Sequence, residues 1–139
     1  MEEDHVRGLS LALVTRSDIA IVATIDDGGC PDARAMMKVE AEGLERLWFT
    51  TNTSSAKVAH LGVDPKSCVY FVDLERWEGL TLLGTANVLR DRPSRERFWR
   101  EGFERYYPGG VDDPDYSIVR FTPERAKYYH GLRKMSFDL

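Results

Sequence analysis

Hydroxyl side chains and one lysine gather in residues 48–57, where an apolar strand is expected to give way to a helix. The first N–H groups of a helix lack partners and lie at the positive end of its dipole, so an anion placed there accepts several hydrogen bonds. Ser54 and Ser55 would add hydroxyl donors, and Lys57 would add a full positive charge. The run could therefore bind a phosphate group.

A second interpretation of the same run is purely structural. Ser54 would then cap the helix by satisfying its free N–H groups, and Lys57 would be a solvated surface residue. Hydroxyl caps are far commoner than ligand sites, so the local pattern alone favours the cap. The choice depends on what the rest of the chain brings to this place.

The spacing of apolar residues divides the chain into short helices and strands. Helices are predicted for residues 3–16, for residues 55–62 and for a segment that starts at Pro93 and is broken at residues 106–110. Strands are predicted for residues 19–25, 33–39, 46–51, 67–72, 77–90 and 116–122, with a short extended or irregular segment at residues 126–130. Phe98, Trp99 and Phe103 form an aromatic stripe on the third helix, which we interpret as packing.

Most connections between these strands are too short for parallel pairing, which needs a crossover of about a dozen residues. The sheet should therefore be mainly antiparallel, and about six strands suggest a small barrel without exposed edges. Gly79 or Gly84 is expected to mark a bend or bulge in the long strand. A chain of 139 residues fits a single domain, residues 1–139.

Composition argues against several classes of function. The 19 Lys and Arg against 23 Asp and Glu give a net charge of −4, which disfavours a nucleic-acid partner. The chain has no apolar run near the roughly 20 residues that span a bilayer, and its acidic start does not resemble a secretion signal, so we expect a cytoplasmic protein without a membrane segment. Cys30 and Cys68 form no disulfide framework and are expected to be reduced, and the three histidines lack metal-ligand spacing.

Four motifs, in fixed order, cover nearly the whole chain. They are Arg34-Ala35-Met36-Met37, then Trp48-Phe49-Thr50-Thr51-Asn52 followed by Ser55 and Lys57, then Gly84-Thr85-Ala86, and finally residues 116–126. Together they resemble the pyridoxamine 5′-phosphate oxidase-like split-barrel flavoproteins, most closely the short general stress protein group. The resemblance implies a mainly β fold with flanking helices: a six-stranded antiparallel split β-barrel of the FMN-binding type.

The resemblance also implies a cofactor and the residues that hold it. In the family, an arginine of the second strand and a serine and a lysine after the third strand hold the phosphate of flavin mononucleotide (FMN), which corresponds here to Arg34, Ser55 and Lys57. Main chain of the same two strands runs beside the flavin. The predicted cofactor-binding residues are therefore Arg34, Ala35, Met36, Thr50, Thr51, Ser54, Ser55 and Lys57. Strand alternation also places Lys38 on the face of Arg34, either in the pocket or at its solvent rim.

The family resemblance implies a homodimer with each cofactor site at the seam between two barrels, acting on a small-molecule redox substrate. Trp77 and Trp99 could face the flavin across this seam, although large aromatic residues more often pack in cores or interfaces. The sequence identifies no catalytic acid or base.

Two departures from the family pattern bear on the activity. Ala56 stands where the true oxidase has an arginine beside the phosphate lysine, so the phosphate would meet one cation fewer. The C-terminal Arg-Leu-His substrate motif of that oxidase is also missing, which disfavours oxidation of pyridoxamine phosphate. The leading hypothesis is an FMN-binding oxidoreductase; the alternatives are a flavin- or haem-binding sensor or storage protein, a deazaflavin-dependent reductase, and an interaction domain with an empty cleft.

Overall fold

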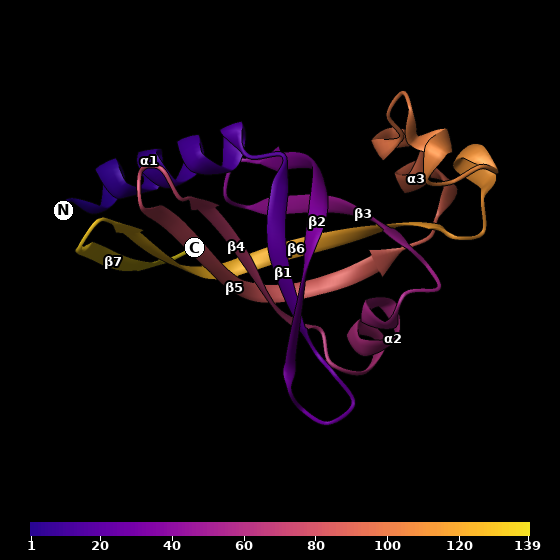
Figure 1. Cartoon of the computed structure of the whole chain (residues 1–139), viewed down its shortest axis with the longest axis horizontal. Helices are drawn as coiled ribbons and strands as arrows, with labels where there is room; N and C mark the ends of the chain where they lie inside the picture. Colours follow the sequence, from indigo (N-terminus) through magenta and orange to yellow (C-terminus); the bar gives the residue numbers. More distant parts are fainter.

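A computed structural model describes all residues, 1–139, as a strongly curved β-sheet with helices packed around it (Figure 1). The helices are α1 (Glu3–Arg16), α2 (Ala56–Val63) and α3 (Arg92–Phe98), followed by short 3₁₀ turns at Phe103–Arg105 and Gly110–Asp112. The strands are β1 (Ile19–Ile25), β2 (Pro31–Glu42), β3 (Arg46–Asn52), β4 (Lys66–Asp73), β5 (Glu78–Leu89), β6 (Tyr116–His130) and β7 (Arg133–Asp138). None of the helices combines the length and the apolar character needed to cross a membrane.

Six of the strands close into an antiparallel barrel. Their order is β3-β2-β1-β4-β5-β6, and a further pairing of β3 with β6 joins the two ends. The expected six-stranded antiparallel barrel with flanking helices is therefore confirmed. Strand β7 is an addition to this ring, because it pairs only with residues 125–130 of β6.

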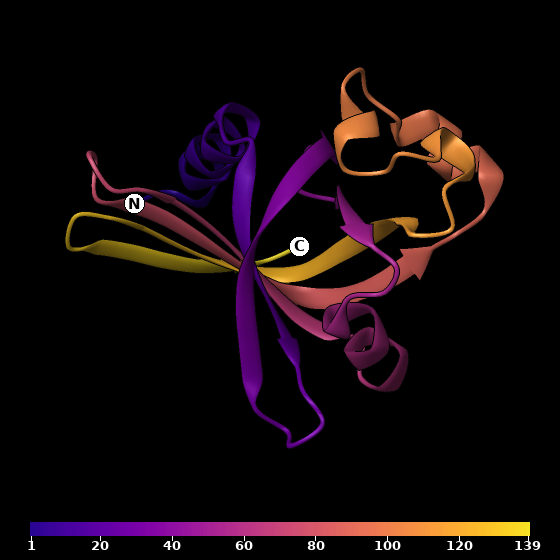
Figure 2. The ribbon, with the colours of Figure 1, turned by 45° about the vertical axis from the view of Figure 1, so that its right-hand side comes forward.

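The C-terminal part of the sheet differs from the prediction. Strand β6 has 15 residues and runs through Pro123, where the sequence suggested a strand ending at Thr122. Proline is tolerated here because it lies beside the register shift between Leu83 and Gly84 of β5. The β4–β5 turn and the β6–β7 turn project together from the barrel, and the β1–β2 hairpin projects in another direction (Figure 2).

Two apolar clusters stabilise the fold. The larger one fills the barrel and includes residues of α1, such as Val6, Leu13 and Val14. The smaller one is mostly aromatic and lies under α3 and the 3₁₀ turns; its buried members are Trp48, Phe98, Phe103, Tyr107, Tyr116 and Ile118. The aromatic stripe of the sequence does pack, as expected. The predicted single helix is wrong, however, because α3 ends at Phe98 and Trp99 has an extended backbone.

Candidate functional site

The barrel is split between β2 and β3. The two strands pair from Lys38–Phe49 to Glu42–Arg46 and then separate. Beyond this point residues 31–37 of β2 pair only with β1, and residues 50–52 of β3 pair only with β6. Each strand thus presents an edge without ladder partners toward the other, so main-chain donors and acceptors on these edges are available to a ligand.

A cavity of about 340 Å³ occupies this split. Five of the eight predicted cofactor-binding residues line it: Ala35, Met36, Thr50, Thr51 and Lys57. Its other lining residues are Ile19, Met37, Asn52, Tyr106 and Tyr107. The cavity therefore brings together apolar side chains, hydroxyl groups, one cation and free strand edges, which suits a flat molecule with a polar rim.

Lys57 lies in the first turn of α2 and lines the cavity. Its Nζ donates hydrogen bonds to Thr51 Oγ1 at 2.9 Å and to Ser55 Oγ at 3.1 Å. Partial burial, and then the positive charge of Arg34, lower the pKa of Lys57. Both of its partners are neutral hydroxyls, so the ammonium charge is held in place without being neutralised by them.

The start of α2 adds backbone donors beside Lys57. Ser55 is the N-cap residue, but its hydroxyl donates to the carbonyl of Asn52 at 2.7 Å and makes no cap hydrogen bond. The N–H groups of Ala56 and Lys57 have no hydrogen-bond partner within the chain. Two free N–H groups and an ammonium group therefore meet at one helix start, which is the arrangement that binds anions.

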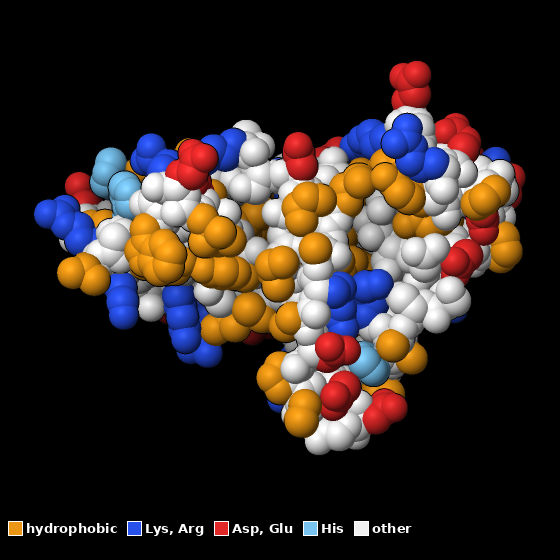
Figure 3. Space-filling model, in the orientation of Figure 1, with side chains coloured by type: hydrophobic (Ala, Val, Ile, Leu, Met, Phe, Trp, Pro, Cys, Tyr) orange, Lys and Arg blue, Asp and Glu red, His pale blue; other side chains and the backbone are white.

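Arg34 approaches from β2, on the same side of the barrel as α2. Its Nη1 donates to Thr24 Oγ1 at 2.9 Å and to the carbonyl of Val22 at 3.3 Å, and its Nη2 donates to Asp32 Oδ2 at 3.1 Å. Its effect on the pKa of Lys57 places the two cations within electrostatic range of each other. Figure 3 shows basic side chains gathered between the β1–β2 strands and α2.

Two predicted or considered residues have contacts elsewhere. The backbone N–H of Ser54 donates to Asp115 Oδ1 at 2.8 Å, so Ser54 belongs to the loop held by that carboxylate. Lys38 is neither in the cavity nor at a solvent rim, because its Nζ donates to the carbonyl of Val14 near the end of α1. Burial lowers the pKa of Lys38, partly offset by Asp18.

Tyr106 and Tyr107 line the cavity and were not anticipated from the sequence. Tyr107 is buried, and burial raises the pKa of its phenol. Tyr106 keeps half of its surface exposed. The sequence signal at this position, Tyr-Tyr-Pro-Gly-Gly, indicated only a helix break, since the irregular segment after α3 folds back over β3 through tertiary packing.

The two tryptophans considered as flavin contacts lie outside this cavity. Trp99 packs edge-on against Phe103 and Tyr116 in the aromatic cluster. Trp77 lies in the β4–β5 turn with a positive φ of 49° and is 59% exposed. Neither lines the cavity within one chain, although Trp99 packs against Tyr107, which does.

A larger cavity, about 490 Å³, lies between α1 and the β2–β3 turn, lined by Arg7, Gly8, Leu11, Leu44, Glu45, Pro123 and Leu139. Its arginine is already paired with Glu3 and with the carbonyl of Asp138. No group of converging polar side chains marks it as a site. The smaller cavity at the split is therefore the better candidate.

Comparison with known proteins agrees with the fold and the motifs. The profile of the Pyridoxamine 5'-phosphate oxidase family matches residues 10–130. A crystal structure of a protein from Clostridium acetobutylicum, related to general stress protein 26 of B. subtilis, is 40% identical with a TM-score of 0.92 over 99% of this chain and 97% of that chain. The chain belongs to the pyridoxamine 5'-phosphate oxidase family.

More distant structures share the fold. General Stress Protein 26 from Bacillus anthracis is 17% identical, with a TM-score of 0.81 over 97% of this chain and 99% of that one. A heme binding protein from Mycobacterium smegmatis is 18% identical, with a TM-score of 0.75 over 99% of this chain and 59% of that one. Comparison with curated proteins gives no match. The expected family and split-barrel fold are confirmed.

Proposed function

We propose that the protein binds FMN in the β2–β3 split and acts as an oxidoreductase on a small molecule. The observation that supports this most directly is the position of the split beside Lys57. A flavin has a flat ring with a hydrogen-bonding edge and a phosphate at the end of a flexible chain. The unpaired strand edges can hydrogen-bond to the edge of the ring. Lys57 and the first N–H groups of α2 can bind the phosphate.

The residues around the start of α2 are well suited to bind a phosphate. A phosphate monoester carries nearly two negative charges at neutral pH. Lys57, Arg34 and the free N–H groups of Ala56 and Lys57 can supply charge-assisted hydrogen bonds from two separate elements of the fold. Ala56 itself adds no cation, so this phosphate grip depends heavily on Lys57.

Bound FMN would supply hydride or electron transfer, while the protein positions the ring and restricts access to it. Met36 and Met37 would contact the ring from β2, Thr50 and Thr51 would contact it from β3, and Tyr107 would close the far wall. The phenol of Tyr107 is protonated at neutral pH, and burial raises its pKa further, so it could donate a hydrogen bond to the ligand.

The proposal includes a homodimer whose seam contains the cofactor site. Ile19 lines the cavity and is also 51% exposed on the outer face of β1, next to the exposed Ile21. Figure 3 shows hydrophobic side chains continuing across this face toward the projecting turns. A second copy packed on this face would cover the open side of the cavity.

An absorption spectrum of the purified protein, followed by anaerobic addition of a reduced nicotinamide, tests the proposal. Flavin bands that bleach are the expected result. Flavin bands that persist with every reductant tried would indicate a binding role, and a Soret band would indicate haem. A colourless protein would be titrated with FMN, a deazaflavin and haem in turn, and failure to bind FMN would overturn the proposal.

A further inference from the structure

Arg34 is held by partners of two kinds. Behind the guanidinium, Thr24 and the carbonyl of Val22 are buried in the wall of β1 and accept from Nη1. In front, Asp32 accepts a single hydrogen bond from Nη2, and its side chain is 53% exposed. The Nε–H of Arg34 makes no hydrogen bond, so one edge of the guanidinium keeps free donor capacity.

The inner partners are further fixed by a histidine. Thr24 Oγ1 lies 3.4 Å from Nδ1 of His60, which is buried in α2. Since Thr24 accepts from Arg34, its hydroxyl proton is free to point to His60. This line of contacts joins β2, β1 and α2, and it sets the position of the arginine from the inside of the barrel.

Charge is unbalanced around this group. The positive charge of Arg34 adds to burial in lowering the pKa of Lys57. Asp32 bonds to Arg34, whereas the side-chain partners of Lys57 are the hydroxyls of Thr51 and Ser55. The other acid of the region, Asp115, is engaged by Asn52 and Ser54 at the start of the loop. Of these two cations, only Arg34 is paired with a carboxylate, and that carboxylate is half exposed.

Resting on the proposed FMN site, we propose that Asp32 is an exchangeable counter-ion of Arg34, which the phosphate of the ligand displaces. The carboxylate neutralises part of the arginine's charge in the free protein and competes with the ligand for Nη2. Asp32 therefore sets the affinity of the site for anions, while Thr24 and Val22 keep the guanidinium in place during the exchange. A single hydrogen bond to a half-exposed carboxylate is weak enough to be replaced.

The experiment compares Asp32→Asn with a matched control, Asp27→Asn, which removes the same charge from the same hairpin at an exposed position without an ion pair. Flavin titrations with FMN and with riboflavin, which lacks the phosphate, are measured at low ionic strength. Asp32→Asn is expected to tighten FMN binding about two- to fivefold relative to Asp27→Asn, the effect of one partly exposed ion pair, and to leave riboflavin unchanged. Unchanged or weaker FMN binding would overturn the proposal.

Calorimetric titration with inorganic phosphate separates this inference from the cofactor assignment. Tighter phosphate binding by Asp32→Asn in a protein that binds no flavin would support the counter-ion role and overturn the flavin assignment. Equal phosphate affinity in Asp32→Asn and Asp27→Asn would overturn the counter-ion role, whether or not flavin binds. Both residues are exposed, so both variants should fold. Their melting temperatures check this.

Discussion

Lys57 combines the properties that a phosphate ligand requires. It is charged and partly buried, and hydroxyl groups of Thr51 and Ser55 fix its position. Burial and Arg34 both disfavour its charge, as its lowered pKa shows. A bound dianion would relieve that penalty, so the surroundings of Lys57 favour an anionic ligand.

Replacement of Lys57 by Met should therefore weaken FMN binding by about 10- to 100-fold, the loss expected for charge-assisted hydrogen bonds. Riboflavin binding should change little, because Lys57 is predicted to act on the phosphate. Fluorescence titration with both ligands measures the difference. Lys66→Met removes the same charge from an exposed lysine just beyond α2 and serves as the control. Equal FMN affinity in the two variants would remove Lys57 from the site.

The sequence could predict the part of this site that is contiguous in the chain. Thr51, Ser55 and Lys57 lie within one strand–helix junction, so local patterns locate them together. The link from Arg34 to Thr24 depends on the register of β1 against β2, which the hairpin turn fixes but does not reveal residue by residue. Tyr106 and Tyr107 reach the cavity only through tertiary packing, for which no local signal exists.

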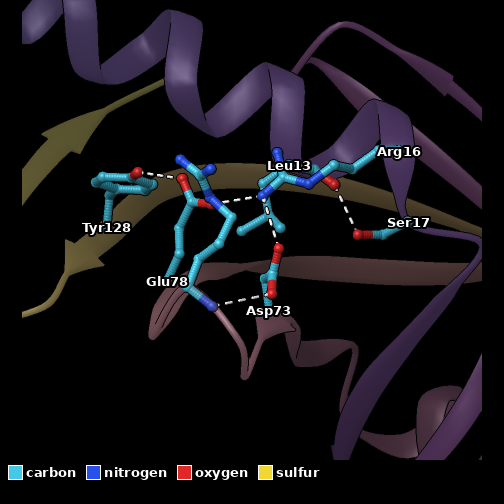
Figure 4. Close-up of polar contacts among 7 residues, drawn as sticks. Leu13, Arg16, Ser17, Asp73, Glu78 and Tyr128 are labelled. Carbon is cyan, nitrogen blue, oxygen red and sulfur yellow. Dashed lines mark hydrogen bonds and ion pairs between the residues drawn. The ribbon is translucent and has the colours of Figure 1, made fainter.

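Among the secondary-structure elements, α1 is anchored to the sheet by a buried carboxylate. Figure 4 shows Arg16, at the end of α1, reaching Glu78 at the start of β5 and Asp73 at the end of β4, while Tyr128 of β6 approaches Glu78 from the other side. Glu78 is 1% exposed, and burial alone would raise its pKa. Hydrogen bonds from Tyr128, Arg16 and Arg76 outweigh this effect and lower the pKa of Glu78.

Glu78→Gln should lower the free energy of unfolding by about 1–3 kcal/mol at pH 7, less than for a fully buried ion pair, because Arg16 and Arg76 remain 41% and 55% exposed. Since the folded pKa lies below the unfolded one, Glu78 stabilises the fold above the unfolded value of about 4.3 and loses this effect as pH falls further. Urea unfolding of both proteins from pH 7 to pH 3 should show the difference shrinking. Glu75→Gln, an exposed acid of the same turn, is the control; a difference independent of pH would contradict the assignment.

The bulge in β5 requires glycine for steric reasons. A Cβ on Gly84 would lie 2.1 Å from the carbonyl oxygen of Thr122, a backbone atom that cannot rotate away. Gly84→Ala is therefore expected to cost about 2 kcal/mol or more of unfolding free energy. In contrast, Gly62→Ala meets open space on α2 and should stabilise by roughly 0.5–1 kcal/mol. Thermal unfolding compares the two; a neutral Gly84→Ala would show that β5 and β6 can separate locally.

Elements with a regular pattern were predictable, and irregular ones were not. The β-branched residues of β1 and the Asp-Asp-Gly-Gly turn defined the first hairpin, and α1 was predicted with its observed bounds. The full length of β6 was missed because proline normally interrupts a strand. Pro123 is accommodated because it lies opposite the bulge at Gly84, and this depends on how β5 and β6 pair, which the sequence alone does not show. Strand β7 has few apolar residues because it lies at the edge of the sheet, where it pairs only with β6.

For the molecule as a whole, the notable surface is the outer face of β1, which carries two exposed isoleucines. Ile19 and Ile21 project outward from β1, and Ile21 lies between Ala35 of β2 and Tyr70 of β4. Stable protein interfaces bury about 800 Å² per partner around an apolar centre. A second copy of the chain on this face would bury both isoleucines and also close the cavity beside Ile19.

Ile21→Lys places a charge at the centre of this face and should convert the proposed dimer into a monomer, because an unpaired ammonium buried between two sheets is costly. Ile21 is 39% exposed in the single chain, so the fold itself should tolerate the lysine. Val63→Lys, on the far end of α2 and 85% exposed, makes the same chemical change outside the face and should leave the mass unchanged. Light scattering at several concentrations measures the mass, and flavin titration of the same samples measures the site. If the seam completes the cofactor site, the monomer should bind FMN more weakly than the Val63→Lys dimer. An Ile21→Lys protein that stays dimeric, or a wild type that is monomeric at every concentration, would place the interface elsewhere or exclude it.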